Sequence, residues 1–107
     1  MSWTVETLDE IVEAELAAWP KDMLARFRWI ASLIATQGLE RVREPHIKHL
    51  EDALWEMRLK GRDGISRALY VTARERRVVV VRVFIKKTPK TPRREIELAL
   101  ARAARVR

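Results

Sequence analysis

The spacing of apolar residues changes from a helical period to a strand period near the middle of the chain. Met23, Phe27, Ile30 and Ile34 recur every three or four residues, as on one face of an α-helix. After residue 53, apolar and polar residues alternate instead, as they do in strands that bury one face. The chain is therefore expected to place helices before an antiparallel sheet.

The helical part is expected to contain a short strand followed by two helices. Residues 3–7 alternate like a strand, and residues 9–19 carry apolar residues at helical spacing, with acids in the first turn where the helix dipole favours them. Pro20 ends this helix and fits the first position of the next, which extends to the stop signal at Gly38. Two antiparallel helices are the expected result.

The sheet is expected to be a three-stranded meander. Residues 39–52 are polar and contain Pro45, which predicts an irregular connection. The alternating stretches that follow are separated by the turn sequences GRDG and RERR. They predict strands at residues 54–60, 65–73 and 78–86.

A terminal helix completes the predicted fold. Thr91 is expected to cap its N-terminus, Pro92 fits its first position, and an apolar stripe continues through Ile96 and Leu100. The order of elements predicts a single α+β domain over residues 1–107. In it, the two N-terminal helices pack on one face of an antiparallel sheet.

The opposite face of the sheet is expected to be open and basic. The inward side chains of the first and third strands are expected to be Trp55, Met57, Leu59, Val79, Val81, Val83 and Ile85. The outward ones are then Glu56, Arg58, Lys60, Arg82, Phe84 and Lys86. In the middle strand, Arg67 and Tyr70 fall on opposite faces. Because an unpaired buried guanidinium is costly, Arg67 is expected outside unless a bulge reorients the strand.

Charge divides the chain at the same place as the apolar period. The formal net charge is +7, and residues 1–53 hold 6 Lys and Arg against 10 Asp and Glu, whereas residues 54–107 hold 16 against 5. A basic half of this kind indicates either a surface that meets a polyanion or an ordinary solvated face. Cations beside an exposed Phe84 would suit single-stranded RNA, although a lone Phe more often belongs to a core.

Residues for other chemistry are scarce. The chain has no cysteine, which excludes disulfides and thiolate metal sites. His46 and His49 lack the glutamate of a zincin motif, so no metal site is expected, and no glycine-rich phosphate loop occurs. Without a signal peptide or a long apolar run, a cytoplasmic protein that uses no cofactor is expected. Trp3 and Trp19 are interpreted as core residues rather than interface anchors.

Two stretches of the second half carry a family resemblance. They read HLEDALWEMRLKGRDGISRALYV and VVVVRVFIKKTPKTPRREIELALARA. They resemble the phage-derived, HigB-like branch of the RelE/ParE toxin superfamily, which has an LWELR strand, a glycine-bearing turn, an R-x-x-Y strand and an F-x-KK-x-x-x-TP segment leading into a helix. The N-terminal half matches in pattern only.

The resemblance implies a RelE-like fold and a toxin of a type II toxin–antitoxin system. Its activity would be ribosome-dependent cleavage of mRNA by a metal-independent endoribonuclease. Its partners would be a cognate helix-turn-helix antitoxin, the ribosome and mRNA, with operator DNA reached only through the antitoxin. The alternatives are a non-cleaving toxin of the same fold that binds and poisons DNA gyrase or the ribosome, and an inert nucleic-acid-binding module or decayed toxin.

Matched by position, the resemblance also implies site residues. The catalytic set would be Arg58 and Lys60 on the first basic strand, Arg67 as a phosphate or transition-state ligand, and Lys86 (or Lys87) at the end of the last strand. No Tyr, His or Asp of the kind that better-studied nucleases carry near the C-terminus is present, so Lys60 is the hypothesis for the general base. Replacing an arginine of the set by Ala is expected to leave the fold intact. RNA-binding contacts are expected from Arg62, Arg82, Phe84, Lys87, Lys90, Arg93 and Arg94.

Overall fold

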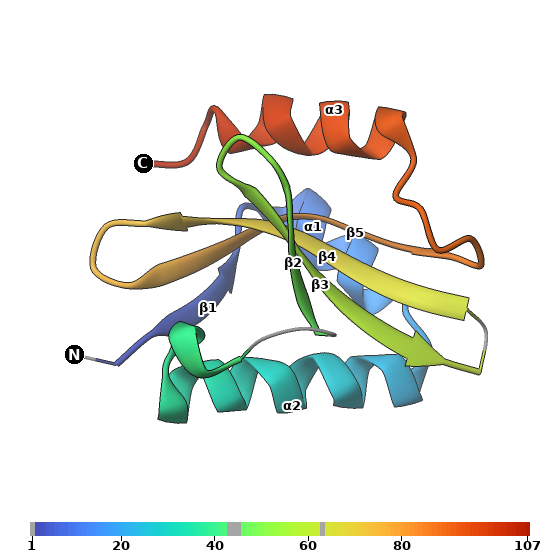
Figure 1. Cartoon of the computed structure of the whole chain (residues 1–107), viewed down its shortest axis with the longest axis horizontal. Helices are drawn as coiled ribbons and strands as arrows, with labels where there is room; N and C mark the ends of the chain where they lie inside the picture. Colours follow the sequence, from blue (N-terminus) through green and yellow to red (C-terminus); the bar gives the residue numbers. More distant parts are fainter. Residues whose placement is uncertain (1, 43–45, 63) are drawn as a thin grey trace.

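A five-stranded sheet forms the centre of the molecule. The computed structural model describes residues 2–42, 46–62 and 64–107, within which the helices and strands below lie. The elements in chain order are β1 (Thr4–Thr7), α1 (Glu10–Ala17), α2 (Lys21–Gln37), the 3-10 helix η1 (Leu39–Arg41), β2 (Ile47–Glu51), β3 (Leu54–Gly61), β4 (Gly64–Ala73), β5 (Arg77–Lys86) and α3 (Arg93–Ala103). The chain thus has the α+β organisation that the sequence predicts (Figure 1).

The strands follow the order β1-β5-β4-β3-β2 across the sheet. The four strands from β2 to β5 pair antiparallel, and β1 joins the free side of β5 in parallel. The predicted meander therefore exists, and it gains a strand on each side. One of these additions, β2, lies within residues 39–52, so the prediction of an irregular connection there was wrong for residues 47–51. Its five residues are mostly polar because it is an edge strand, and they carry no clear alternation.

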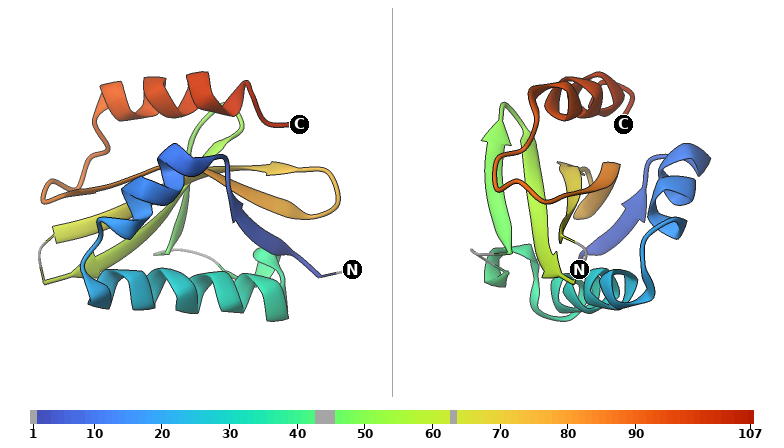
Figure 2. Two further views of the ribbon diagram at one scale, coloured as in Figure 1. Left: turned by 180° about the vertical axis from the view of Figure 1, so that it is seen from behind. Right: turned by 90° about the vertical axis from the view of Figure 1, so that its right-hand side faces the viewer.

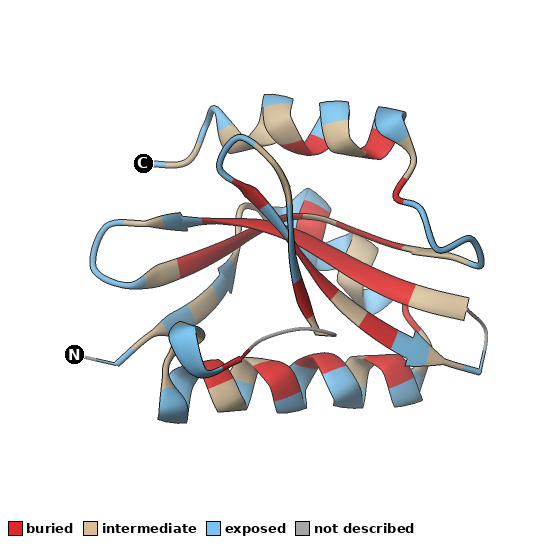
Figure 3. Ribbon diagram, viewed as in Figure 1, coloured by how far each residue is buried: buried red, intermediate tan, exposed pale blue. Residues whose placement is uncertain are grey.

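Helices cover both faces of the sheet (Figures 1 and 2). α1 and α2 contribute Val12, Met23 and Phe27 to one apolar cluster, together with Tyr70 of β4. α3 packs on the other face, where its buried Ala99 joins a second cluster with residues of β3, β4 and β5. The prediction that this second face is open was wrong, because the apolar stripe of α3 needs an apolar surface to bury and finds it there. The centre of the sheet is accordingly buried on both sides (Figure 3).

A β-bulge in β5 explains how one valine-rich strand serves both clusters. Leu69 pairs with Arg82 but Tyr70 pairs with Val80, so Val81 is an extra residue on β5. Val83 faces the α2 cluster as predicted, whereas Val81, together with Val79, faces the α3 cluster. The inward placement predicted for Val79 and Val81 was therefore wrong, because strict alternation was continued through the bulge.

Two further predictions concern local contacts. Trp19 is 6% exposed and packs edge-on against Phe27, with ring centroids 6.1 Å apart, which confirms it as a core residue. The capping prediction for Thr91 was wrong. Pro92 is the N-cap of α3 and makes no side-chain cap, while the Thr91 hydroxyl donates to the Glu56 carboxylate on β3. No described helix has the length and apolar character that crossing a membrane requires.

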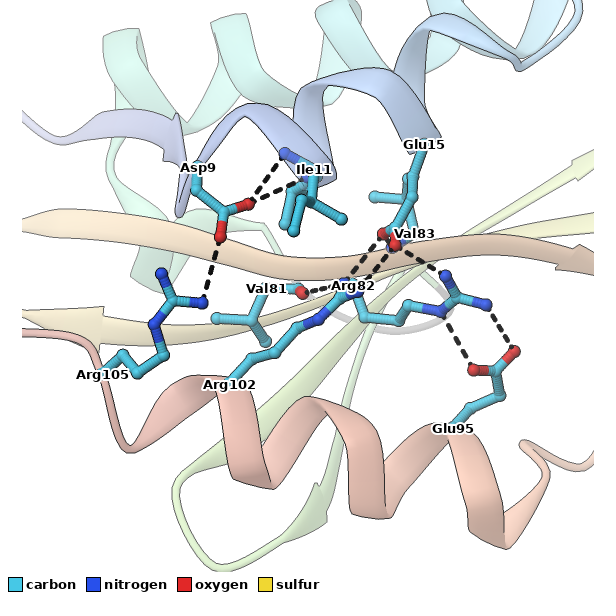
Figure 4. A network of polar contacts seen from close by, with 10 residues as sticks. Asp9, Ile11, Glu15, Val81, Arg82, Val83, Glu95, Arg102 and Arg105 are labelled. Atoms are coloured by element: carbon cyan, nitrogen blue, oxygen red, sulfur yellow. Dashed lines mark hydrogen bonds and ion pairs between the residues drawn. The ribbon is translucent and has the colours of Figure 1, made fainter.

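An ionic network joins α1, β5 and α3 (Figure 4). Glu15 on α1 accepts hydrogen bonds from Arg82 at 2.8 Å and from Arg102 at 3.1 Å. Arg82 also donates to both oxygens of Glu95 on α3, at 3.0 and 3.1 Å. The same Nη1 of Arg102 also donates to the carbonyl oxygen of Val81 at 2.9 Å. The three elements are therefore held together by charges that are largely shielded from water.

The protonation of Glu15 couples this network to pH. Burial alone would raise the pKa of the Glu15 carboxyl, but the hydrogen bonds from Arg102 and the Val83 N–H, with the charge of Arg82, lower it below its ordinary value of 4.5. Because the folded-state pKa is the lower one, the ionised carboxylate stabilises the fold above about pH 4.5. That stabilisation disappears as the pH falls through the folded-state pKa.

We expect Glu15→Gln to lower the free energy of unfolding by about 1–2 kcal/mol at pH 7, because charge-assisted hydrogen bonds become neutral ones. Urea denaturation at pH 7 and at pH 3.5 measures this, and the gap between variant and parent should narrow at the lower pH. Glu10→Gln, at an exposed position of the same helix, is the control and should have little effect. A gap that stays constant with pH would contradict the role given to Glu15.

Candidate nucleic-acid interface

Lysines and arginines of β3, β5 and the residues beside them gather at the end of the sheet where β3 and β5 end and β4 begins (Figure 1, right). Lys60 pairs in register with Ile65, which pairs with Lys86, so the two lysines flank a residue on one sheet face. Neighbouring strands lie about 4.8 Å apart, which separates the two lysine backbones by about 10 Å. Gly64 allows β4 to begin this close to β5: its φ is +133°, and a Cβ there would lie 3.2 Å from the carbonyl oxygen of Lys86.

We call this set the basic end. Its members are Lys60, Arg62, Lys86, Lys87, Lys90 and Arg94. All are exposed except Lys86, which is half-buried. Within the described ranges, none of the six side chains makes a hydrogen bond or ion pair with another residue. Cations without acidic partners are free to neutralise an anionic ligand.

The two predicted catalytic arginines, Arg58 and Arg67, lie behind this surface instead of on it. Arg67 is fully buried, and its Nη2 donates to the carbonyl oxygens of Thr88 and, at 2.9 Å, Pro89. Arg58 is 20% exposed, and its Nη2 donates to the same Pro89 oxygen at 2.5 Å. Both guanidinium groups therefore hold the segment that follows β5 against the sheet. This segment is the proline-containing stretch that carries the last lysines of the basic end.

A buried carboxylate balances the two arginines. Glu56 has no exposed surface, and its Oε1 accepts from Arg58 Nε at 3.0 Å. Its Oε2 accepts from the Thr91 hydroxyl and lies 3.7 Å from Arg67 Nε. We refer to these four residues as the Glu56 cluster. Burial lowers the pKa of Arg67 and the charge of Arg58 adds to this, with Glu56 opposing both, but an arginine remains protonated in any protein.

The expectation of an exposed Arg67 was therefore wrong. Arg67 and Tyr70 do lie on opposite faces, as alternation predicts. Burial of the guanidinium is nevertheless possible because a carboxylate and two carbonyl groups compensate it, and none of these partners is adjacent in sequence. Even so, Nε and Nη1 of Arg67 lack hydrogen-bond partners, so the compensation is incomplete.

Three of the residues predicted to bind RNA are engaged within the protein, two in ion pairs and one in the core. Arg82 is bound to Glu15 and Glu95. Arg93 pairs with Glu51 and with Glu97 one helical turn away. Phe84 is 7% exposed, and two guanidinium carbons lie near its ring, that of Arg67 at 5.9 Å and that of Arg82 at 5.8 Å from the ring centroid. Phe84 is therefore a core residue without a surface for a base. This decides between the two interpretations of Phe84 in favour of the core.

Sequence reasoning missed a hollow beside the basic end. Its lining consists of Arg26, Trp29, His46, Arg58, Leu59 and Lys60, which come from α2, from the residue before β2 and from β3. The available signal was Trp29, an aromatic residue that falls outside the apolar stripe of α2 and is 53% exposed. Among the described residues, no group of His, Asp and Glu is arranged to hold a metal ion.

Comparison with protein families identifies the chain. The model of the family described as "Phage derived protein Gp49-like (DUF891)" matches residues 14–104. The chain therefore belongs to this family, and the phage-derived resemblance of its sequence is confirmed. No match is found among curated proteins.

Solved structures show that the fold is that of RelE. A mutant of the Escherichia coli toxin RelE in the free state superposes with a TM-score of 0.66 at 16% identity, covering 95% of this chain and 98% of that one. The archaeal RelE–RelB complex from Pyrococcus horikoshii OT3 gives a TM-score of 0.57 at 19% identity, covering 79% of this chain and 96% of that one. The predicted RelE-like fold is confirmed.

The Glu56 cluster predicts that Arg67→Met destabilises the protein by about 3–5 kcal/mol, because Glu56 then loses a buried counter-charge. Glu56→Gln combined with Arg67→Met should cost less than the sum of the two single changes, since neither charge is left alone. Urea denaturation of the four proteins measures this. Lys60→Met, an exposed control, should stay within about 0.5 kcal/mol of the parent. Strictly additive losses would show that the two side chains do not interact.

Proposed function

We propose that this member of the Gp49-like family is the toxin of a type II toxin–antitoxin system, and that it stops translation by cutting mRNA on the ribosome. The family and the RelE fold support the toxin assignment. The observation that carries the nuclease assignment is the basic end, where six cations, five exposed and one half-buried, have no partners among the described residues. Such a surface attracts an RNA backbone.

In this proposal Lys60 and Lys86 flank the scissile phosphate. The ribose 2′-oxygen attacks the adjacent phosphorus, the 5′-oxygen leaves with a proton from the Lys86 ammonium group, and a cyclic phosphate remains. Lys60 acts as the neutral amine and becomes an ammonium group when it takes up the 2′-hydroxyl proton. Its positive charge and that of Lys86 then neutralise the charge that accumulates on the pentacovalent phosphate, which is the largest contribution available to a site built from cations. Lys60 is our candidate for the group that accepts the proton of the 2′-hydroxyl.

Arg58 and Arg67 receive a different role from the one that the family resemblance implies. Their guanidinium groups bind the carbonyl oxygens of Thr88 and Pro89, so they position the segment that carries Lys87 and Lys90. We propose them as positioning residues. The exposed members of the basic end, Arg62 and Arg94 included, then bind the flanking phosphates.

The proposal includes the partners and the setting. We place the whole chain, residues 1–107, in one toxin domain that works in the cytoplasm on the ribosome and its mRNA. A cognate antitoxin neutralises it, by analogy with the RelE–RelB pair of Pyrococcus horikoshii. We propose a helix-turn-helix antitoxin of the HigB-associated type, which would make any contact with operator DNA indirect.

One observation favours a second candidate, a non-cleaving toxin that binds the ribosome or DNA gyrase. Both arginines of the expected catalytic set are engaged with loop carbonyls, and only lysines remain at the centre of the surface. Lysines without a further acid or base bind phosphate more readily than they cleave it. This candidate predicts growth arrest with intact transcripts.

Primer extension on mRNA from cells that briefly express the chain separates the two candidates. The nuclease predicts discrete breaks that require translation. Changing Lys60 and Lys86 together to Ala should reduce the breaks by about 100-fold, because two transition-state cations are lost. Neither side chain is buried, so the double variant should fold normally.

The matched control is Arg74→Ala, which removes an exposed cation at the β4–β5 turn, far from the basic end (Figure 1, left). It should leave cleavage unchanged. Growth arrest without breaks would refute the nuclease and support the binding toxin. Breaks that persist in the double variant would refute the site but not the activity.

A further inference from the structure

We propose that the hollow between α2 and the outer edge of β3 binds one unpaired base of the RNA, next to the basic end. The inference rests on the proposed function for its choice of RNA and adds a subsite to it. The hollow holds about 230 Å³. That is below the roughly 300–1,000 Å³ of sites for drug-sized molecules, and it suits a single ring system.

The indole of Trp29 indicates a planar ligand. Trp29 is 53% exposed, although the apolar stripe of the same helix is buried. Its ring meets the His46 ring edge to face, with centroids 5.8 Å apart and an interplanar angle of 84°. The imidazole therefore fixes the orientation of the indole while much of its surface stays in contact with water. A fixed, exposed aromatic ring is the usual platform for a base of single-stranded RNA.

The positive charges around the indole indicate that the ligand of the hollow is an anion. Arg26 lies one helical turn before Trp29, and Lys60 lines the hollow from β3. Both are exposed, and neither has a hydrogen bond or ion pair with another described residue. Arg58 adds its aliphatic stem, since its guanidinium is turned toward Glu56 and Pro89. Among the residues that the structure describes, no acid lines the hollow; Asp22 lies one turn before Arg26 on α2, near Gly61.

Lys60 belongs both to the hollow and to the basic end, which makes the two surfaces continuous. An RNA strand whose phosphates lie between Lys60 and Lys86 therefore meets Trp29 on leaving the basic end. An acidic peptide would satisfy the cations of the hollow but would leave the indole without a planar partner. A phosphate backbone with unstacked bases satisfies both, so RNA is the better occupant.

Binding of fluorescein-labelled, single-stranded RNA to the full chain, followed by anisotropy, tests the pocket. Trp29→Ala should weaken binding about tenfold, which corresponds to the loss of one stacked base. Trp29→Phe should restore most of the affinity. An oligonucleotide with the same phosphates but without bases should bind the parent and Trp29→Ala equally. Lys60→Gln should weaken the binding of both the RNA and the base-free oligonucleotide.

Trp55→Ala is the matched control, because Trp55 is also exposed, at 38%, but lines a separate groove. It should bind RNA like the parent. Equal RNA affinity of Trp29→Ala and the parent would overturn the inference, as would equal losses for the base-bearing and base-free ligands. Unchanged RNA binding with weakened antitoxin binding would also overturn it and assign the hollow to a protein.

The test is separate from that of the proposed function. A chain that binds RNA through Trp29 but leaves mRNA intact would refute the nuclease and support the pocket. A chain that cuts mRNA, with undiminished RNA affinity in Trp29→Ala, would refute the pocket alone.

Discussion

The buried carboxylate of Glu56 is the constraint on which the loop after β5 depends, and with it the lysines that this loop carries. A negative charge with no exposed surface would cost several kcal/mol without compensation. Two arginines and a threonine supply that compensation, and the arginines use their remaining donors on backbone carbonyls of the segment after β5. One charge in the sheet thereby fixes the path of a proline-containing loop. Lys87 and Lys90, which this loop carries, owe their positions to this buried balance of charge.

The sequence predicts where the helices and strands of this fold lie better than it predicts which face of the sheet each strand residue occupies. The stripe from Met23 to Ile34 defines α2 because a helix covering one face of a sheet must repeat its apolar residues at that spacing. The bulge at Val81 leaves no such trace, since four consecutive valines satisfy either phase equally well. β2 cannot be predicted from the sequence for a related reason, because a short polar edge strand is recognised only beside its partner β3.

The candidate site divides along a similar line. Alternation correctly assigns Arg58, Lys60 and Lys86 to one sheet face. Whether a cation on that face is free depends on acids that are distant in the chain: the Glu15 carboxylate that binds Arg82 comes 67 residues earlier. Periodicity describes the direction of a side chain, whereas its availability is a property of tertiary pairing. Trp29 is informative because it is an aromatic residue that falls outside the apolar stripe of α2.

The ionic network also constrains the order in which the chain can mature. Arg102 and Glu15 are separated by 87 residues, and Arg105 reaches Asp9 across 96. During synthesis, which proceeds from the N-terminus, helix α1 and strand β1 are complete long before these partners or β5 exist. The loop pinned by the Glu56 cluster is likewise made late, after residue 87. The nascent chain therefore carries no assembled basic surface until the segment after β5 has been made.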